Sequence, residues 1–136
     1  MEQLAVEIVG LCREYGECRV ERMEEVRRVK NALESVCVVA RRKLDISDPA
    51  LLLALLDAYE VTRDEGMLQE VLDVVGRNLD RLAVSAESVK LLAYCYYYVE
   101  EEECAERARR MLEELRKMGR GEEELADAET ILEELT

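Results

Sequence analysis

Hydrophobic residues recur every three to four positions along the whole chain, which is the spacing of helices that have one apolar face. No segment alternates apolar and polar residues with the two-residue period of a β-strand, and the chain contains one proline. The pattern therefore predicts an all-α protein of about seven antiparallel helices, either a helical-repeat array or an irregular helical bundle. The predicted helices cover residues 3–15, 18–44, 49–63, 65–82, 86–99, 103–118 and 122–135.

Start signals mark two of these helices clearly. Asp48 is followed by Pro49, which combines a capping carboxylate with a proline at the first helical position. Ser85 supplies a capping hydroxyl in the same way before residues 86–99. The helices that follow these caps are apolar around most of their circumference, so we expect them to be the most buried in the protein.

Two segments of the chain echo each other at an offset of about 37 residues. At this offset Leu55 falls on Leu92 and Tyr59 falls on Tyr96. The correspondence continues through Leu68 and Ala105, Val71 and Ala108, and Val75 and Leu112. A repeat of this length, built from two helices, is typical of stacked arrays that bind other molecules rather than of catalytic scaffolds.

The sequence allows two structures at the turn inside the second copy. Glu100 to Glu103 are four consecutive carboxylates with no helix-breaking residue. They would repel one another at a helix C-terminus but would suit the N-terminus of a following helix. The repeat alignment places a turn here, opposite residues 63–65. The sequence favours a hairpin at this point and leaves one continuous helix open.

The second copy resembles the tetratricopeptide repeat family, since Leu92, Ala93, Tyr96, Ala105 and Leu112 follow that motif in order. The first copy offers Leu55, Leu56, Tyr59, Leu68, Leu72 and Val75. The copies depart from the motif at Leu56 and Leu68, where small residues are usual, at Arg109, where an aromatic is usual, and at Glu100, where glycine is common. Neither copy ends in the usual proline.

This resemblance covers residues 49–118 and implies a right-handed array of helical hairpins with a groove for a polypeptide. The expected organisation is a single helical domain, 1–136. Residues 1–45 form an N-terminal helix pair, residues 49–118 form two hairpins, and residues 122–135 form a C-terminal capping helix.

Charge narrows the range of partners. The net charge is −13, and residues 51–136 hold 22 acidic but only 10 basic side chains. Such a surface repels phosphate backbones, so we expect no nucleic-acid partner and favour a basic polypeptide. No apolar run approaches the ~20 residues that span a bilayer, and no signal peptide is evident at the amino terminus. We therefore expect a cytoplasmic protein without membrane contact.

The chemistry that enzymes need is not apparent. The chain has no histidine, no phosphate-binding glycine loop and no zinc-protease motif, so we predict no enzyme, no cofactor and no metal. Its five cysteines lack the C-x-x-C spacing of a zinc site, and we expect mostly free, buried thiols. A disulfide between Cys12 and Cys18 is left open.

Four of the six tyrosines lie within residues 94–98. Lys90, Tyr94, Tyr97 and Tyr98 fall on one strip of the predicted helix, because helical neighbours are three or four residues apart. Tyrosine is favoured at interfaces, so the strip is a candidate partner-binding surface. Alternatively, the rings pack beneath a neighbouring helix.

The leading hypothesis is a non-catalytic protein–protein interaction scaffold that binds a polypeptide in a helical groove. The alternative is a homo-oligomeric structural helical protein without a groove ligand.

Overall fold

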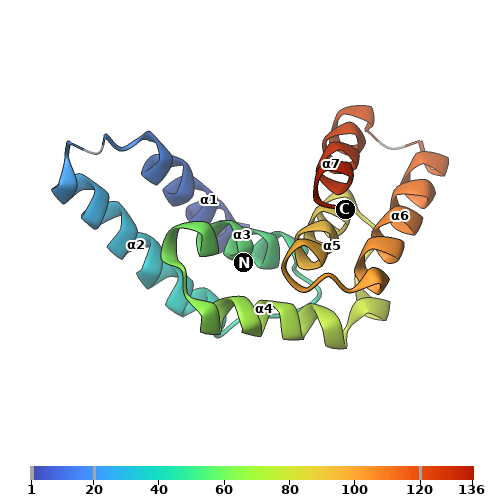
Figure 1. The fold of residues 1–136 in the computed structure, drawn as a ribbon, viewed down its shortest axis with the longest axis horizontal. Helices are drawn as coiled ribbons and strands as arrows, with labels where there is room; N and C mark the ends of the chain where they lie inside the picture. Colours follow the sequence, from blue (N-terminus) through green and yellow to red (C-terminus); the bar gives the residue numbers. More distant parts are fainter. Residues whose placement is uncertain (1, 20, 120) are drawn as a thin grey trace. The chain divides into compact units, whose positions relative to one another are not determined.

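The computed structural model describes residues 2–19, 21–119 and 121–136 of the chain, and these residues form seven α-helices, one short 3₁₀ turn and no strand (Figure 1). The predicted all-α class and the number of helices are confirmed. The elements are α1 (Glu2–Glu17), α2 (Met23–Arg41), α3 (Pro49–Thr62), α4 (Glu65–Arg77), the 3₁₀ turn η1 (Leu79–Arg81), α5 (Ala86–Val99), α6 (Glu102–Lys117) and α7 (Glu122–Leu135).

The helix predicted over residues 18–44 is too long at both ends, since α2 covers only Met23–Arg41. Beyond Arg41 the chain leaves the helix, and the Asp45 carboxylate accepts a hydrogen bond from the Ser47 backbone N–H at 2.9 Å. At the helix end itself, the Arg42 and Lys43 N–H groups donate to the Val39 and Ala40 carbonyls, three residues back. The segment then buries Ile46 and delivers Asp48 to the start of α3.

The helix predicted over residues 65–82 also ends early, at Arg77. Asn78 leaves the helical conformation at φ −130°, and the chain continues as the η1 turn. Gly76 and Asn78 are both poor helix formers, which accounts for the break.

Both predicted caps are confirmed. The Asp48 side chain accepts a hydrogen bond from the Leu51 N–H at 3.3 Å, and the Ser85 hydroxyl oxygen accepts one from the Ser88 N–H at 3.1 Å. Each bond satisfies a backbone donor that the first turn of the helix leaves without a partner. The two caps lie 37 residues apart, which is the offset of the sequence repeat.

The turns that follow α3 and α5 also correspond at an offset of 37 residues. Arg63 and Glu100 both adopt the left-handed conformation, at φ 55° and 53°. The Arg63 N–H donates to the Tyr59 carbonyl at 2.9 Å, and the Glu100 N–H donates to the Tyr96 carbonyl at 2.7 Å. Residues 100–103 therefore hold a hairpin, as favoured, and not a continuous helix.

One side-chain contact closes each turn. The Tyr59 hydroxyl donates to Glu65 at 2.5 Å, and the Tyr96 hydroxyl approaches Glu102 at 3.5 Å. The segments α3–α4 and α5–α6 thus repeat the same cap, turn and tyrosine–glutamate pairing at one offset.

The chain divides into two compact units, Met1–Val74 and Val75–Thr136. In the first unit α1 packs against α2 and α3, and α2 packs against α3. In the second unit α5 packs against α6 and α7, and α6 packs against α7. Each unit therefore contains three helices that contact one another, a pattern that occurs both in helical bundles and in stacked hairpins. The single domain and the tetratricopeptide assignment stay predictions.

The helices α3 and α5 carry the densest runs of buried residues, as expected from their apolar circumference. Leu55 and Leu92, which correspond in the repeat, have no exposed surface. In the second unit α6 contributes Ala105 and Ala108, also fully buried, and these small side chains allow α5 and α6 to pack closely.

Candidate functional site

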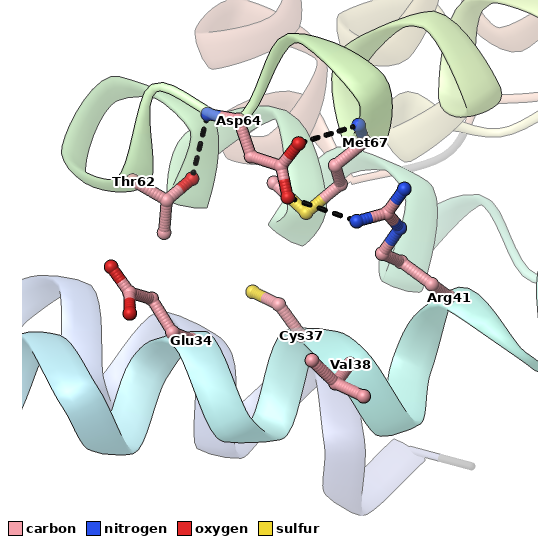
Figure 2. A pocket seen from close by; sticks show the side chains of 7 residues that line it. All are labelled: Glu34, Cys37, Val38, Arg41, Thr62, Asp64 and Met67. Atoms are coloured by element: carbon pink, nitrogen blue, oxygen red, sulfur yellow. Dashed lines mark hydrogen bonds and ion pairs between the residues drawn. The ribbon is translucent and has the colours of Figure 1, made fainter.

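The first unit contains a cavity of about 380 Å³. It lies between α2, the turn after α3 and the start of α4 (Figure 2). Glu34, Cys37, Val38 and Arg41 line it from α2, Thr62 and Asp64 line it from the end of α3 and the turn, and Met67 lines it from α4. We call this the α2–α4 pocket.

Arg41 fixes one wall of the α2–α4 pocket. Its Nε and Nη2 donate to the two carboxylate oxygens of Glu70 at 2.9 and 2.7 Å, and its Nη1 donates to Asp64 at 2.9 Å. The hydrogen bonds from Arg41 lower the pKa of Glu70 and raise the pKa of Arg41 itself. Such a bidentate pair is geometrically specific, so it holds α4 against the end of α2.

Asp64 also caps the N-terminus of α4. Its Oδ1 accepts a hydrogen bond from the Met67 backbone N–H at 3.1 Å, which caps the first turn of α4. Its backbone N–H donates to the Thr62 hydroxyl oxygen at 3.4 Å. Figure 2 shows both carboxylate oxygens of Asp64 engaged, one with Met67 and the other with Arg41.

Glu34 is the acidic group of the pocket that is not engaged in this way. Within the described part of the chain, its carboxylate makes no hydrogen bond and no ion pair. It reaches from α2 toward Thr62 at the end of α3 (Figure 2). Burial raises the pKa of the neighbouring Cys37 thiol to about 12, which disfavours the nucleophilic thiolate at neutral pH.

The predicted tyrosine strip lies on α5 in the second unit. Tyr97 is 55% exposed, whereas Tyr94 and Tyr98 are half-buried. The rings of Tyr97 and Tyr98 meet edge to face, with centroids 5.2 Å apart and planes at 81°. The Lys90 ammonium forms an ion pair with Asp127 of α7 at 2.6 Å, so its charge already has an acidic neighbour in the same unit.

The strip is therefore not uniformly open, because α7 packs along α5 and engages its Lys90 end. Tyr97 is its most exposed member and the most available for contact with a partner. The partner-binding role of Lys90, Tyr94, Tyr97 and Tyr98 stays a prediction.

A smaller cavity of about 90 Å³ lies in the second unit, lined by Val84, Arg107, Arg110, Met111 and Glu114. The Nε of Arg107 is buried and has no hydrogen-bond partner among the described residues. Neither cavity was foreseen from the sequence, because Glu34, Arg107 and Arg110 occupy ordinary polar positions of amphipathic helices. No local pattern distinguishes them from solvated residues.

All five cysteines are free thiols, and Cys37, Cys95 and Cys104 are buried, as expected. The disulfide between Cys12 and Cys18 that the sequence left open is not formed. Burial raises the pKa of Cys12 to about 11 and is also the main reason that the pKa values of Cys95 and Cys104 are raised.

Across residues 2–19, 21–119 and 121–136, no cluster of three or more metal-ligating side chains is arranged to hold an ion. In the same residues, no helix combines the length and apolarity required to cross a membrane.

Comparison with known proteins identifies a solved structure with a similar fold. No family model matches the chain, and no curated protein matches it. Among solved structures, the chain is similar to the crystal structure of the transcription anti-terminator antagonist UpxZ from Bacteroides uniformis, with a TM-score of 0.68. The alignment covers 97% of this chain and 91% of that chain at 20% identity. At this identity, the likeness shows that the two proteins share an all-helical fold over nearly their whole lengths.

Proposed function

We propose that this protein is a non-catalytic regulator that binds another protein, and that its partner acts in the control of transcription termination. The observation that carries this proposal is the fold likeness to an antagonist of a transcription anti-terminator, which extends over 97% of the chain. Binding to a protein surface is sufficient to antagonise a factor, so the proposed function needs no catalytic group in this chain.

The surface chemistry supports a protein as the partner. Tyr97 presents a large, rigid, exposed ring on α5, and the ring of Tyr98 packs against it edge to face. Exposed tyrosines of this kind supply much of the binding energy in protein interfaces. The net charge of −13 disfavours direct contact with nucleic acid and favours a partner with a basic surface, whose association weakens with salt.

The test is capture from an extract of the organism in which the protein occurs, followed by titration calorimetry with each captured protein after purification. We expect a transcription factor with a basic surface among the captured proteins. Tyr97→Ala should weaken its binding by about tenfold, as expected for a moderate hot spot. Met118→Ala is the matched control, because Met118 is a 57% exposed side chain in the same unit.

Two outcomes would count against the proposal. One is a set of captured proteins that includes no factor of the transcription machinery. The other is a partner that binds Tyr97→Ala as tightly as it binds the unmodified chain, which would move the interface away from α5.

Self-association is the competing function, and one surface favours it. On α1, Val6 is 70% exposed and Val9 lies on the same side one turn further on. Beside them, Gly10 has open space where a side chain would lie. A second copy could cover this face. Light scattering decides the question, because a monomer at micromolar concentration eliminates the alternative, whereas a dimer that Val6→Glu dissociates would establish it.

A further inference from the structure

We propose that the α2–α4 pocket receives an arginine side chain of the protein partner. This inference rests on the proposed function and names the chemistry that the partner presents. Its basis is the combination of size, charge and apolar walls at a site with no assigned role.

The pocket is large enough to admit an inserted side chain. Its volume of about 380 Å³ lies near the lower limit of ligand pockets, which span roughly 300–1,000 Å³. The pocket is built by three separate segments of the first unit, and Arg41 ties two of them together through Asp64 and Glu70. The walls are therefore held in place before a ligand arrives, which lowers the cost of binding.

The charge of the pocket favours a cation. Among the lining residues and Glu70, which pairs with Arg41, three are acidic: Glu34, Asp64 and Glu70. Arg41 is the single basic residue of this group. Because Arg41 is already engaged by Asp64 and Glu70, it does not neutralise Glu34. The Glu34 carboxylate is thus open to a guanidinium, which binds a carboxylate through two parallel hydrogen bonds.

The remaining walls suit the stem of an arginine. Cys37, Val38 and Met67 are apolar, and the Cys37 thiol stays neutral because burial raises its pKa to about 12. Val38 is 51% exposed, so it can cover the methylene groups of an incoming chain. The Thr62 hydroxyl lies in the lining as a further polar group.

A divalent cation fits this site less well. Calcium and magnesium take six or more oxygen ligands, usually from several carboxylates. Both oxygens of Asp64 already accept hydrogen bonds, from Met67 and Arg41, which leaves Glu34 as the open carboxylate of the lining. An organic cation with an apolar stem would contact the apolar walls as well as Glu34, whereas a metal ion would contact the carboxylate alone.

The experiment is an NMR titration of the ¹⁵N-labelled protein with the blocked peptide acetyl-Gly-Arg-Gly-amide. Two matched peptides carry citrulline or lysine in place of arginine. Citrulline has the shape of arginine without its charge, and lysine has the charge without the planar fork. We expect saturable shifts of the Glu34, Cys37 and Met67 amides with the arginine peptide, weaker shifts with lysine and none with citrulline.

Glu34→Gln removes the open charge while keeping the shape of the side chain. It should weaken binding of the arginine peptide by about three- to fivefold, the upper range for a partly exposed ion pair. Glu14→Gln is the matched control, because it makes the same charge change at an exposed residue of α1 outside the pocket. The control should bind the peptide as the unmodified protein does.

The inference is overturned if the citrulline peptide shifts the same amides to the same extent, or if Glu34→Gln binds the arginine peptide unchanged. The comparison of peptides needs no variant, so it stands even if a substitution disturbs folding. Failure here is distinguishable from failure of the proposed function, because partner capture is measured through Tyr97 on α5. If a partner is captured but the arginine peptide does not bind, the proposed function stands and the arginine inference is wrong.

Discussion

At the scale of single residues, the turns of the two repeated segments depend on a left-handed backbone at Arg63 and Glu100. Among the described residues, these are the positions other than glycine with positive φ. The tetratricopeptide motif commonly has glycine at the position of Glu100. Both turns therefore adopt a conformation that glycine reaches most easily, although both residues carry a side chain.

We predict that Glu100→Gly stabilises the protein. A left-handed L-residue costs roughly 1–2 kcal/mol, and the extra freedom of glycine in the unfolded chain offsets about 0.4–1 kcal/mol of that gain. The expected net increase in the free energy of unfolding is about 0.5–1 kcal/mol. Urea denaturation measures it, and a destabilised variant would show that the turn is not strained.

Arg63→Gly supplies the comparison for this variant. The Arg63 guanidinium lies 5.7 Å from the centre of the Tyr59 ring, and glycine would lose that contact. A cation–π pair at an exposed site contributes about 0.5–1 kcal/mol, so the gain at Arg63 should be smaller than the gain at Glu100.

The thiols give a second prediction at this scale. Because the thiolate is the reactive species, a raised pKa slows alkylation at neutral pH. Burial raises the pKa of Cys12 to about 11 and of Cys37 to about 12, so iodoacetamide at pH 8 should label the folded protein slowly at both residues. Their rates should increase as pH rises toward those pKa values. Mass spectrometry of the digested protein assigns each site, and rapid labelling of Cys37 at pH 8 would contradict its burial.

At the scale of elements, Arg41 is the connection that joins α2 to α4 and to the turn before it. Its three hydrogen bonds link residues 23 and 29 positions apart in the sequence. Lys90 and Arg116 perform the same task in the second unit, where they form ion pairs with Asp127 and Glu129 of α7.

We predict that Arg41→Leu lowers the free energy of unfolding at pH 7 by about 1–2 kcal/mol, as expected for charge-assisted hydrogen bonds at a partly exposed site. The Glu70 carboxylate has a pKa below its ordinary value of 4.5 because Arg41 donates to it. Its stabilising contribution is therefore present above pH 4.5 and is lost as pH falls through the lower, folded-state value.

The variant should accordingly lose less stability between pH 5 and pH 3 than the unmodified protein does. Urea denaturation at several pH values measures both effects. Parallel stability profiles for the two proteins would show that the Arg41–Glu70 pair does not contribute.

The corresponding leucines of α3 and α5 give the second prediction for elements. Leu55 and Leu92 have no exposed surface, so replacing either by alanine should cost about 2–5 kcal/mol. Val99→Ala at an exposed position of α5 is the control and should cost less than about 0.5 kcal/mol. A loss below about 0.5 kcal/mol at both leucines would contradict the assignment of the core.

At the scale of the whole molecule, the features predicted from sequence are those set by nearby residues. The helices and the caps at Asp48 and Ser85 follow from short spacings, and the repeat offset follows from matching two segments of the chain. The end of α2 is formed by the Arg42 and Lys43 N–H groups, which donate to carbonyls three residues back, and apolar periodicity does not register such bonds. The partial cover of the tyrosine strip depended on Lys90 meeting Asp127 of another helix.

The α2–α4 pocket could not be predicted, because it requires segments about 30 residues apart to meet. Glu34 occupies an ordinary polar position of an amphipathic helix, and only the fold brings it near Thr62 and Met67. The identity of the partner cannot be predicted from sequence patterns for the same reason, because a binding surface is assembled from residues that are distant in the sequence.

The measurement that tests the central claim most directly is terminator readthrough in a transcription extract of the organism in which the protein occurs. The template should carry a terminator that anti-termination factors of the extract allow polymerase to pass. Adding the purified protein at micromolar concentration should reduce readthrough, whereas Tyr97→Ala should reduce it less and Met118→Ala should act as the unmodified protein does. Unchanged readthrough at a concentration that saturates binding of the captured partner would contradict the account.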